Sequence, residues 1–514
     1  MTNAQKDSLF VLIKSLSKSE KRQFKLYVNR LGVNADAKFL ALFNLFDKMH
    51  DYNEKEILKS GIVKKQQLSN LKAHLYKQVL VSLRLNPVNQ NIRIQIREQM
   101  DFATILYHKG LYRQSLKILE KAKQLAIENE EKNIAYEIVE FEKIIETQYI
   151  TRSMSGRADE LAVQAKELSM QNVITSRLSN LSLQLYGILL KSGYVKSDEE
   201  NQRITEYFYS RLPKCKLEDL GFREKLWLYK AHLWYSFLTQ DFLSCYKYAS
   251  KLTDLFYENE QMIYLNPVYY LKGNNYLLES LFMLKYKTQF KAVLERLEKT
   301  IASEPFPKNE NVSSLCFLYI YINKLNLHFV GGTFEEGLSL VDDILKELKA
   351  HRDTIDEHHV MVFYYKIACM YFGNGDNRMC ISYLKKIIDN KNLTMREDLM
   401  CFSRVLSLVA HYEAGMDYHL DVQLKSTYKF LLKMNDLHEV QKEMIKFLRN
   451  LGNIYPHELK KEFKKLHSRF KELDNDPYER RAFLYLDIIS WLESKIENKP
   501  VGIIIQEKAK KLVR

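Results

Sequence analysis

A helical-hairpin pattern recurs about every 44 residues and limits what this chain can fold into more than any other feature. It is clearest where a small residue, Ala368, precedes a glycine turn at Gly375 and a second small residue, Cys380, follows five positions later. Comparable turns are predicted at Gly110, Gly156, Gly193, Gln240, Gln289, Gly332 and Gly415. A period of this length predicts stacked pairs of antiparallel helices, in which each pair buries its apolar face against the next.

The scarcity of turn residues supports a chain that is helical nearly throughout. Gly and Pro number 16 and 8, which is under 5% of 514 residues, whereas an average protein holds about 12%. Sheets, hairpins and long loops need these residues at their turns. We therefore predict an all-α protein, and its 46% hydrophobic residues are enough for a continuous core.

The best-matching segments resemble tetratricopeptide repeats. Small residues at Ala103 and Ser115 flank the turn at Gly110, and a similar pattern runs from Gly332 to Gly337. The resemblance implies a right-handed superhelical stack of antiparallel helix pairs with a concave binding groove. The step of this chain is longer than the family's ~34 residues, so the resemblance implies a divergent tetratricopeptide-like α-solenoid. HEAT-like stacks have a similar period and remain an alternative.

Three regions follow from this pattern. Residues 1–87 are predicted to form a basic helical N-terminal cap, 88–435 the repeats, and 436–514 a C-terminal helical cap. In the first region Ser17 and Glu20 have the spacing of a capping box. The predicted helices there are 17–31, 36–50, 53–60 and 66–85, and Pro87 ends the last. In the third region we expect a helix starting at Asp476-Pro477 and a basic helix over 501–514.

The formal charge of +14 is unevenly distributed. Residues 1–100 carry a net +10 and residues 455–514 a net +4, whereas residues 101–454 are neutral. An acidic partner should therefore dock at the ends of the chain, mainly at the N-terminal one.

Six basic residues are the candidate contacts for an acidic partner. Four of them recur at helical spacing in the first region, where each could meet a phosphate and release counterions. Two more begin the second helix of a segment, 54–81, that superficially resembles a helix-turn-helix. Polar Ser60, Gln67 and Asn70 occupy positions that this motif needs to be apolar, so a solvated basic surface is the simpler interpretation. The six are Lys18, Lys21, Arg22, Lys25, Lys64 and Lys65.

No residue pattern predicts catalysis, a cofactor or a metal. Gly373 and Gly375 lack the third glycine of a dinucleotide-binding fingerprint and follow a helix. Neither a P-loop nor a GxSxG motif is present. The histidines at 351, 358 and 359 cluster, but a polar helix start explains them without a metal. The aromatic run from Trp227 to Phe237 is interpreted as core packing.

These observations lead to two functional hypotheses. Six cysteines without a CxxC pair favour a reducing compartment, and the longest apolar run, Leu315–Ile322, is too short to span a bilayer. The first hypothesis is a non-enzymatic cytoplasmic adaptor or scaffold that binds a protein or peptide in the solenoid groove. The alternative is a nucleic-acid- or ribosome-associated factor that docks through its basic N-terminal region. The oligomeric state is left open.

Overall fold

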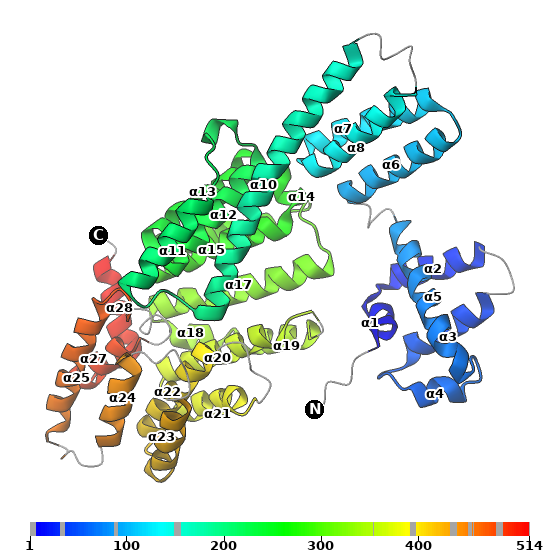
Figure 1. The fold of residues 1–514 in the computed structure, drawn as a ribbon. Coiled ribbons are helices and arrows are strands. Elements are labelled where there is room, and N and C mark those ends of the chain that lie inside the picture. Colours follow the sequence, from blue (N-terminus) through cyan, green and yellow to red (C-terminus); the bar gives the residue numbers. More distant parts are fainter. Residues whose placement is uncertain are drawn as a thin grey trace. The chain divides into compact units, whose positions relative to one another are not determined.

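Every element of the computed structural model is a helix over the residues that the structure describes (Figure 1). These residues form two compact units, 1–170 and 171–514. Both predicted region boundaries, at 87/88 and 435/436, lie outside the described residues and stay predictions. The described residues are 7–30, 36–86, 91–148, 156–352, 354–390, 397–431, 439–450, 455, 457–479 and 487–512.

The first unit begins with a bundle of five helices. Their bounds agree with the four predicted helices and add one before them. The capping box is confirmed, because the Ser17 amide donates to Glu20 Oε2 at 2.8 Å and the Glu20 amide donates to Ser17 Oγ at 3.2 Å. Phe24 and Phe43 meet in the core with ring centroids 4.6 Å apart. The helices are α1 Ser8–Ser15, α2 Lys18–Arg30, α3 Asp36–Lys48, α4 Glu54–Lys59 and α5 Lys65–Arg84.

Three further helices of the first unit show why small residues occur beside the turns. They are α6 Ile92–His108, α7 Tyr112–Glu128 and α8 Lys132–Glu146. Ser115 Oγ donates to the carbonyl of Ala103 at 2.8 Å, which requires α6 and α7 to cross closely. Gly110 makes the predicted turn with φ +74°. A second turn at Glu130, φ +59°, has no glycine and was not predicted.

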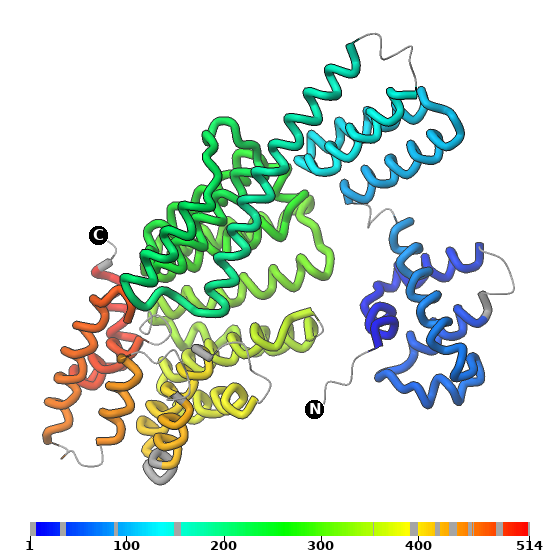
Figure 2. The backbone as a smooth tube through the Cα atoms, in the orientation of Figure 1, coloured from blue at the N-terminus to red at the C-terminus, as the bar shows by residue number. Residues whose placement is uncertain are grey.

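A single helix, α10 (Ala158–Ser192), continues from the first unit into the second (Figure 2). In the second unit, helices that follow one another along the chain pack in pairs, as the sequence pattern predicts. These pairs run from α11 to α23. Their bounds are α11 Asp198–Arg211, α12 Phe222–Leu238, α13 Phe242–Glu258, α14 Gln261–Leu265, α15 Pro267–Met283, α16 Lys287–Ala302, α17 Glu310–Gly331, α18 Phe334–Leu338, α19 Val341–Ala350, α20 Glu357–Gly373, α21 Asn377–Ile388, α22 Glu397–Glu413 and α23 Asp417–Leu431.

The turns of the second unit confirm most of the predicted period. Gln240 has φ +57° and takes the place of a glycine, as expected. The predicted turn at Gln289 is wrong, since this residue lies inside α16 and the left-handed residue is Lys285, φ +58°. The Lys285 amide donates to the Phe282 carbonyl at 3.0 Å, so local hydrogen bonds stabilise a conformation that lysine rarely adopts. With no glycine, the turn left no signal in the sequence.

The C-terminal helices are α24 Glu439–Asn450, α25 Leu459–Asp474, α27 Ile488–Glu497 and α28 Val501–Leu512. The helix predicted to start at Pro477 is not present at that position, because residues 476–479 form a bend and a turn. Residues 480–486 lie outside the described part of the chain. The terminal helix is confirmed, and it packs against α17, where Gln506 Nε2 donates to the Gly332 carbonyl at 3.0 Å.

This packing depends on a pair of glycines. A methyl group on Gly332 would lie 2.6 Å from the carbonyl oxygen of Gly502, so any side chain there would force the two segments apart. Gly332 also has φ +65°, which glycine adopts without strain. The last helix is therefore fixed to a position 174 residues earlier in the chain. No described helix is both long and apolar enough to cross a bilayer.

Candidate ligand-binding pocket

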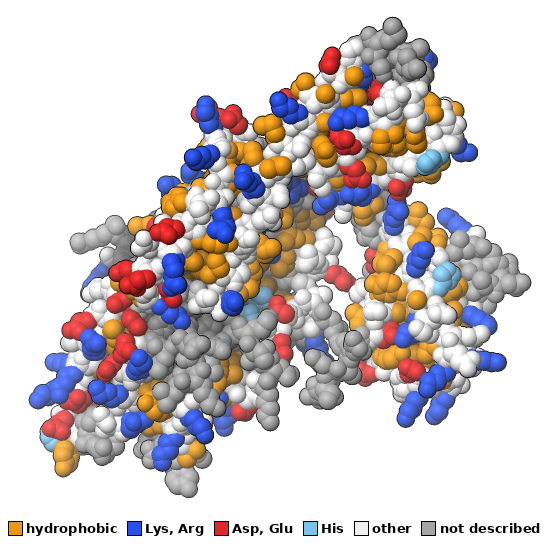
Figure 3. Space-filling view, in the orientation of Figure 1, with side chains coloured by type: hydrophobic (Ala, Val, Ile, Leu, Met, Phe, Trp, Pro, Cys, Tyr) orange, Lys and Arg blue, Asp and Glu red, His pale blue; other side chains and the backbone are white. Residues whose placement is uncertain are grey.

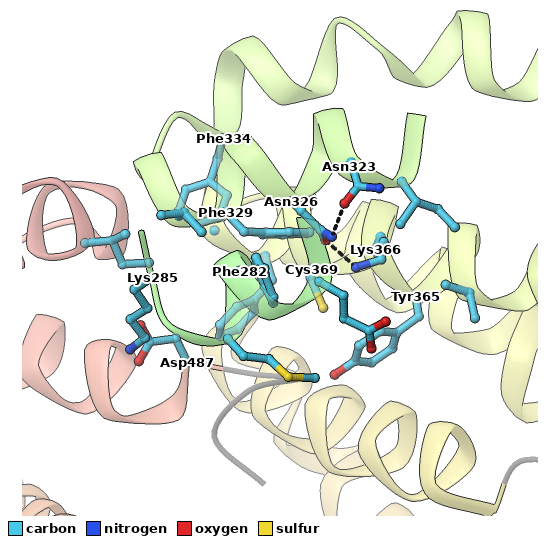
Figure 4. A pocket seen from close by; sticks show the side chains of 18 of the residues that line it. Phe282, Lys285, Asn323, Asn326, Phe329, Phe334, Tyr365, Lys366, Cys369 and Asp487 are labelled. Carbon is cyan, nitrogen blue, oxygen red and sulfur yellow. Dashed lines mark hydrogen bonds between the residues drawn. The ribbon is translucent and has the colours of Figure 1, made fainter. Parts of the chain in front are cut away.

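The second unit contains a pocket of about 400 Å³ between α15, α17, α20 and α28 (Figure 4). Helices α15, α17 and α20, which are separated in the chain by α16, α18 and α19, supply three of its walls. The terminal helix supplies the fourth through Val501 and Ile505. On α15 the pocket residues include Asn275, Glu279 and Phe282, which recur at the spacing of one helix face. Pocket residues also recur at helical spacing on α17 and α20, so one face of each of the three helices lines the pocket.

Aromatic rings form one side of the pocket. Phe282, Phe329 and Phe334 come from three different elements and lie on the same side in Figure 4. Phe334 is held against Gly373, where a methyl group would lie 2.4 Å from the ring. Apolar walls of this kind suit a hydrophobic side chain of a ligand.

A line of amide side chains crosses three helices on the other side. Asn323 Nδ2, on α17, donates to Asn275 Oδ1 on α15 at 2.9 Å. Asn326 Nδ2 donates to Asn323 Oδ1 at 3.3 Å. Lys366 Nζ, on α20, then donates to Asn326 Oδ1 at 2.6 Å. The line ties neighbouring helix pairs together and places amide groups, which can both donate and accept hydrogen bonds, at the pocket wall.

Lys366 is one of three lysines that line the pocket, together with Lys285 and Lys508. Lys366 Nζ lies 5.8 Å from the ring centroid of Phe282 and 5.6 Å from that of Phe329. Burial among these rings lowers the pKa of Lys366 to about 8. Burial has the opposite effect on the neighbouring Cys369 thiol and raises its pKa to about 12, so this cysteine is protonated and unreactive at neutral pH.

The six basic residues predicted from the sequence belong to the first unit, whereas the pocket belongs to the second. Lys21 pairs with Asp47 at 2.8 Å, and Lys25 Nζ lies 5.9 Å from the ring centroid of Phe43. Both therefore take part in packing within the bundle. The remaining four are exposed, and Lys and Arg side chains are spread over the visible surface of this bundle (Figure 3). They are Lys18, Arg22, Lys64 and Lys65.

Sequence reasoning did not identify the pocket residues. Asn323 and Asn326 lie within a largely apolar helix and are only 1% and 6% exposed. Buried amides at core positions are unusual and need hydrogen-bond partners. Two asparagines in an apolar helix were therefore the one sequence feature that could have indicated a site. Their partners, however, lie on other helices, and no local pattern shows which helices those are.

The histidine cluster is explained by helix capping and packing. Asp356 caps α20, and its carboxylate contacts His359 Nδ1 at 2.6 Å. His351 stacks on Phe317. Within the described part of the chain, no group of three or more His, Cys, Asp or Glu side chains is placed to hold a metal ion. All six cysteines are free, and four of them are buried, as expected for small apolar residues in helices.

A scan against protein-family models, a search of curated proteins and a search of solved structures each return no match.

Proposed function

We propose that this chain is a non-enzymatic cytoplasmic adaptor whose second unit binds a polypeptide partner in the pocket between α15, α17 and α20. In this proposal the stacked pairs belong to a divergent, right-handed tetratricopeptide-like solenoid, and the pocket lies in its concave groove. One observation carries the proposal. The amide line from Asn275 to Lys366 faces the same pocket as the Phe282, Phe329 and Phe334 rings.

This combination matches the chemistry of a peptide. The main chain of a bound peptide offers N–H and C=O groups in alternation, and carboxamides meet both kinds. Aromatic walls accept alternate side chains and exclude water from those hydrogen bonds. A groove supplied by several repeats also lets the partner contact more than one helix pair.

The proposal is tested by placing a photoreactive amino acid in the pocket of the full chain in cells. Val362 lines the pocket, whereas Leu243 on α13 is 63% exposed and lies outside it. We expect discrete protein adducts from position 362 and none from position 243, identified by mass spectrometry. Adducts at neither position, or the same adducts at both, would contradict the proposal.

A second candidate is docking of the N-terminal bundle on RNA or a ribosome. It is favoured because Lys18, Arg22, Lys64 and Lys65 are exposed and pair with no carboxylate among the described residues. Each cation that neutralises a phosphate releases counterions, so affinity should fall steeply with salt.

Changing these four residues to Glu is therefore expected to abolish binding to a single-stranded RNA oligomer, measured by fluorescence anisotropy at two salt concentrations. The control reverses four exposed lysines of the second unit, Lys291, Lys299, Lys308 and Lys349, and should bind RNA nearly as well as the unmodified chain. Equal loss in both variants, or binding that does not depend on salt, would count against this candidate.

A further inference from the structure

Two lysines lie near each other on α12 and α15, and neither is among the residues that line the pocket. Lys272 is on α15, three positions before the pocket residue Asn275 and therefore on the same helix face. Lys230 is on α12, whose partner α13 packs against α15. The aromatic run from Trp227 to Phe237 thus contains a cation, which the interpretation of this run as core packing overlooked.

Two aromatic rings lie near the Lys230 ammonium. Its Nζ lies 4.2 Å from the ring centroid of Trp227 and 5.2 Å from that of Tyr269. The two rings meet edge to face with centroids 5.7 Å apart. Trp227 precedes Lys230 by three residues, and Tyr269 precedes Lys272 by three, so each helix presents an aromatic residue and a lysine on one face. The two helices repeat the same arrangement side by side.

Neither lysine has a counter-ion among the residues described. No carboxylate comes within ion-pair distance of Lys230 or Lys272, and both side chains are only partly exposed. Burial, together with the positive charge of Lys272, lowers the pKa of Lys230 to about 8. Two adjacent, partly desolvated cations repel each other, so this arrangement disfavours the unliganded protein. An anion between them would remove the repulsion and supply the missing partner.

We propose that Lys230 and Lys272, framed by Trp227 and Tyr269, form an anion-binding subsite for a carboxylate or phosphate that the polypeptide partner carries on an apolar or aromatic stem. The anion lies between the two ammonium groups, and the stem packs on the Trp227 and Tyr269 rings. This inference rests on the proposed function, since it assigns part of the partner's chemistry. The proposed subsite is distinct from the pocket. The pocket lysine Lys366 already donates a hydrogen bond to Asn326, whereas Lys230 and Lys272 have no such polar partner among the described residues.

The test uses the full chain and four small probes: inorganic phosphate, phenyl phosphate, phenylacetate and, as the neutral probe, benzyl alcohol. Binding is followed by calorimetry and by tryptophan fluorescence, because an anion at the subsite changes the surroundings of Trp227. We expect saturable binding of the aromatic anions and none of benzyl alcohol. Tighter binding of phenyl phosphate assigns a phosphate to the subsite, and tighter binding of phenylacetate assigns a carboxylate.

The decisive variants are Lys230→Met and Lys272→Met, which keep the apolar stem of lysine and remove its charge. Each should weaken binding of the preferred anion at least tenfold, a loss of about 1.4 kcal/mol. Lys291→Met on α16 is the control, because this lysine is 63% exposed, and it should bind as the unmodified chain does. The Lys230→Met chain should resist urea at least as well as the unmodified chain, since it loses an unpaired cation.

Absence of saturable anion binding, or equal affinity in all three lysine variants, would overturn the subsite. The proposed function is judged separately. If Val362 still captures a partner in the Lys230→Met and Lys272→Met chains as strongly as before, the adaptor stands and the subsite does not. If the anions bind but no partner is captured, the subsite stands and the adaptor does not.

Discussion

Replacing Glu142 with glutamine is expected to destabilise the first unit by about 3 kcal/mol, because it leaves a buried lysine without its main counter-ion. Lys123 and Glu142 are 3% and 1% exposed, and Lys123 Nζ lies 2.8 Å from Glu142 Oε2. Arg157 reaches the other oxygen of Glu142 at 3.5 Å. Glu120, which also contacts Lys123, is more exposed and compensates only in part.

The loss is measured by hydrogen exchange of the peptides covering α7 and α8, since the chain's three tryptophans all lie in the second unit. Glu140→Gln is the matched control. It breaks a contact of similar length on the same helix, 2.7 Å to Lys143, but this pair is exposed and should change stability by less than about 1 kcal/mol. The double variant Lys123→Met/Glu142→Leu should recover most of the loss, because well-packed apolar residues replace a buried ion pair without penalty. Equal effects of Glu142→Gln and Glu140→Gln would contradict this account.

The second unit is expected to lose about 3 kcal/mol of stability as the pH falls from 6.5 to 4, through one histidine. His232 stacks on Tyr248 with centroids 4.3 Å apart, and it also contacts Phe208. Burial, reinforced by the charges of Lys251 and Lys247, lowers the pKa of His232 from 6.5 to about 4. Over this window the unfolded chain binds a proton that the folded chain does not, so acid favours unfolding. Above pH 6.5 both states are neutral at this residue, and its effect disappears.

Urea unfolding followed by tryptophan fluorescence at a series of pH values measures this loss. His232→Phe keeps a ring against Tyr248 but cannot take up a proton, so stability should vary less between pH 6.5 and 4.5. A residual slope is expected from His328, whose pKa burial also lowers. His457→Phe alters an exposed histidine and should leave the pH dependence unchanged. An unchanged slope in His232→Phe would contradict the assignment.

The elements that the sequence predicted are those whose signals are local. The capping box at Ser17 and Glu20 and the turn at Gly110 each depend on residues only a few positions apart. At Glu130 and Lys285, as at Gln240, a residue other than glycine adopts the left-handed conformation. The repeat period located the turn at Gln240 but not the other two. The ion pair of Lys123 with Glu142 was also missed, since it joins two helices and each residue alone resembles a surface charge.

The two candidate sites also differ in whether their residues are close together in the sequence. The six basic residues of the N-terminal region were visible as a composition bias. In the structure Lys21 pairs with Asp47 and Lys25 lies near the Phe43 ring, and the role of the six as partner contacts stays a prediction. The pocket residues, in contrast, produce no composition bias or local pattern in the sequence. Its amide line joins Asn275 to Asn323 across 48 residues and Asn326 to Lys366 across 40, separations at which helical periodicity carries no information.

By itself the sequence determined that this chain is helical and that consecutive helices pack in pairs, because helix formation and glycine turns depend on neighbours along the chain. It also placed the net positive charge at the ends. Only the tertiary structure decided which helix faces meet. A segment that is neutral in total brings Lys230 near Lys272 with no carboxylate at ion-pair distance among the described residues. The terminal helix of the chain packs at Gly332 and completes a pocket. Net charge is the same whichever way the side chains point. Helix packing, in contrast, decides which side chains come together.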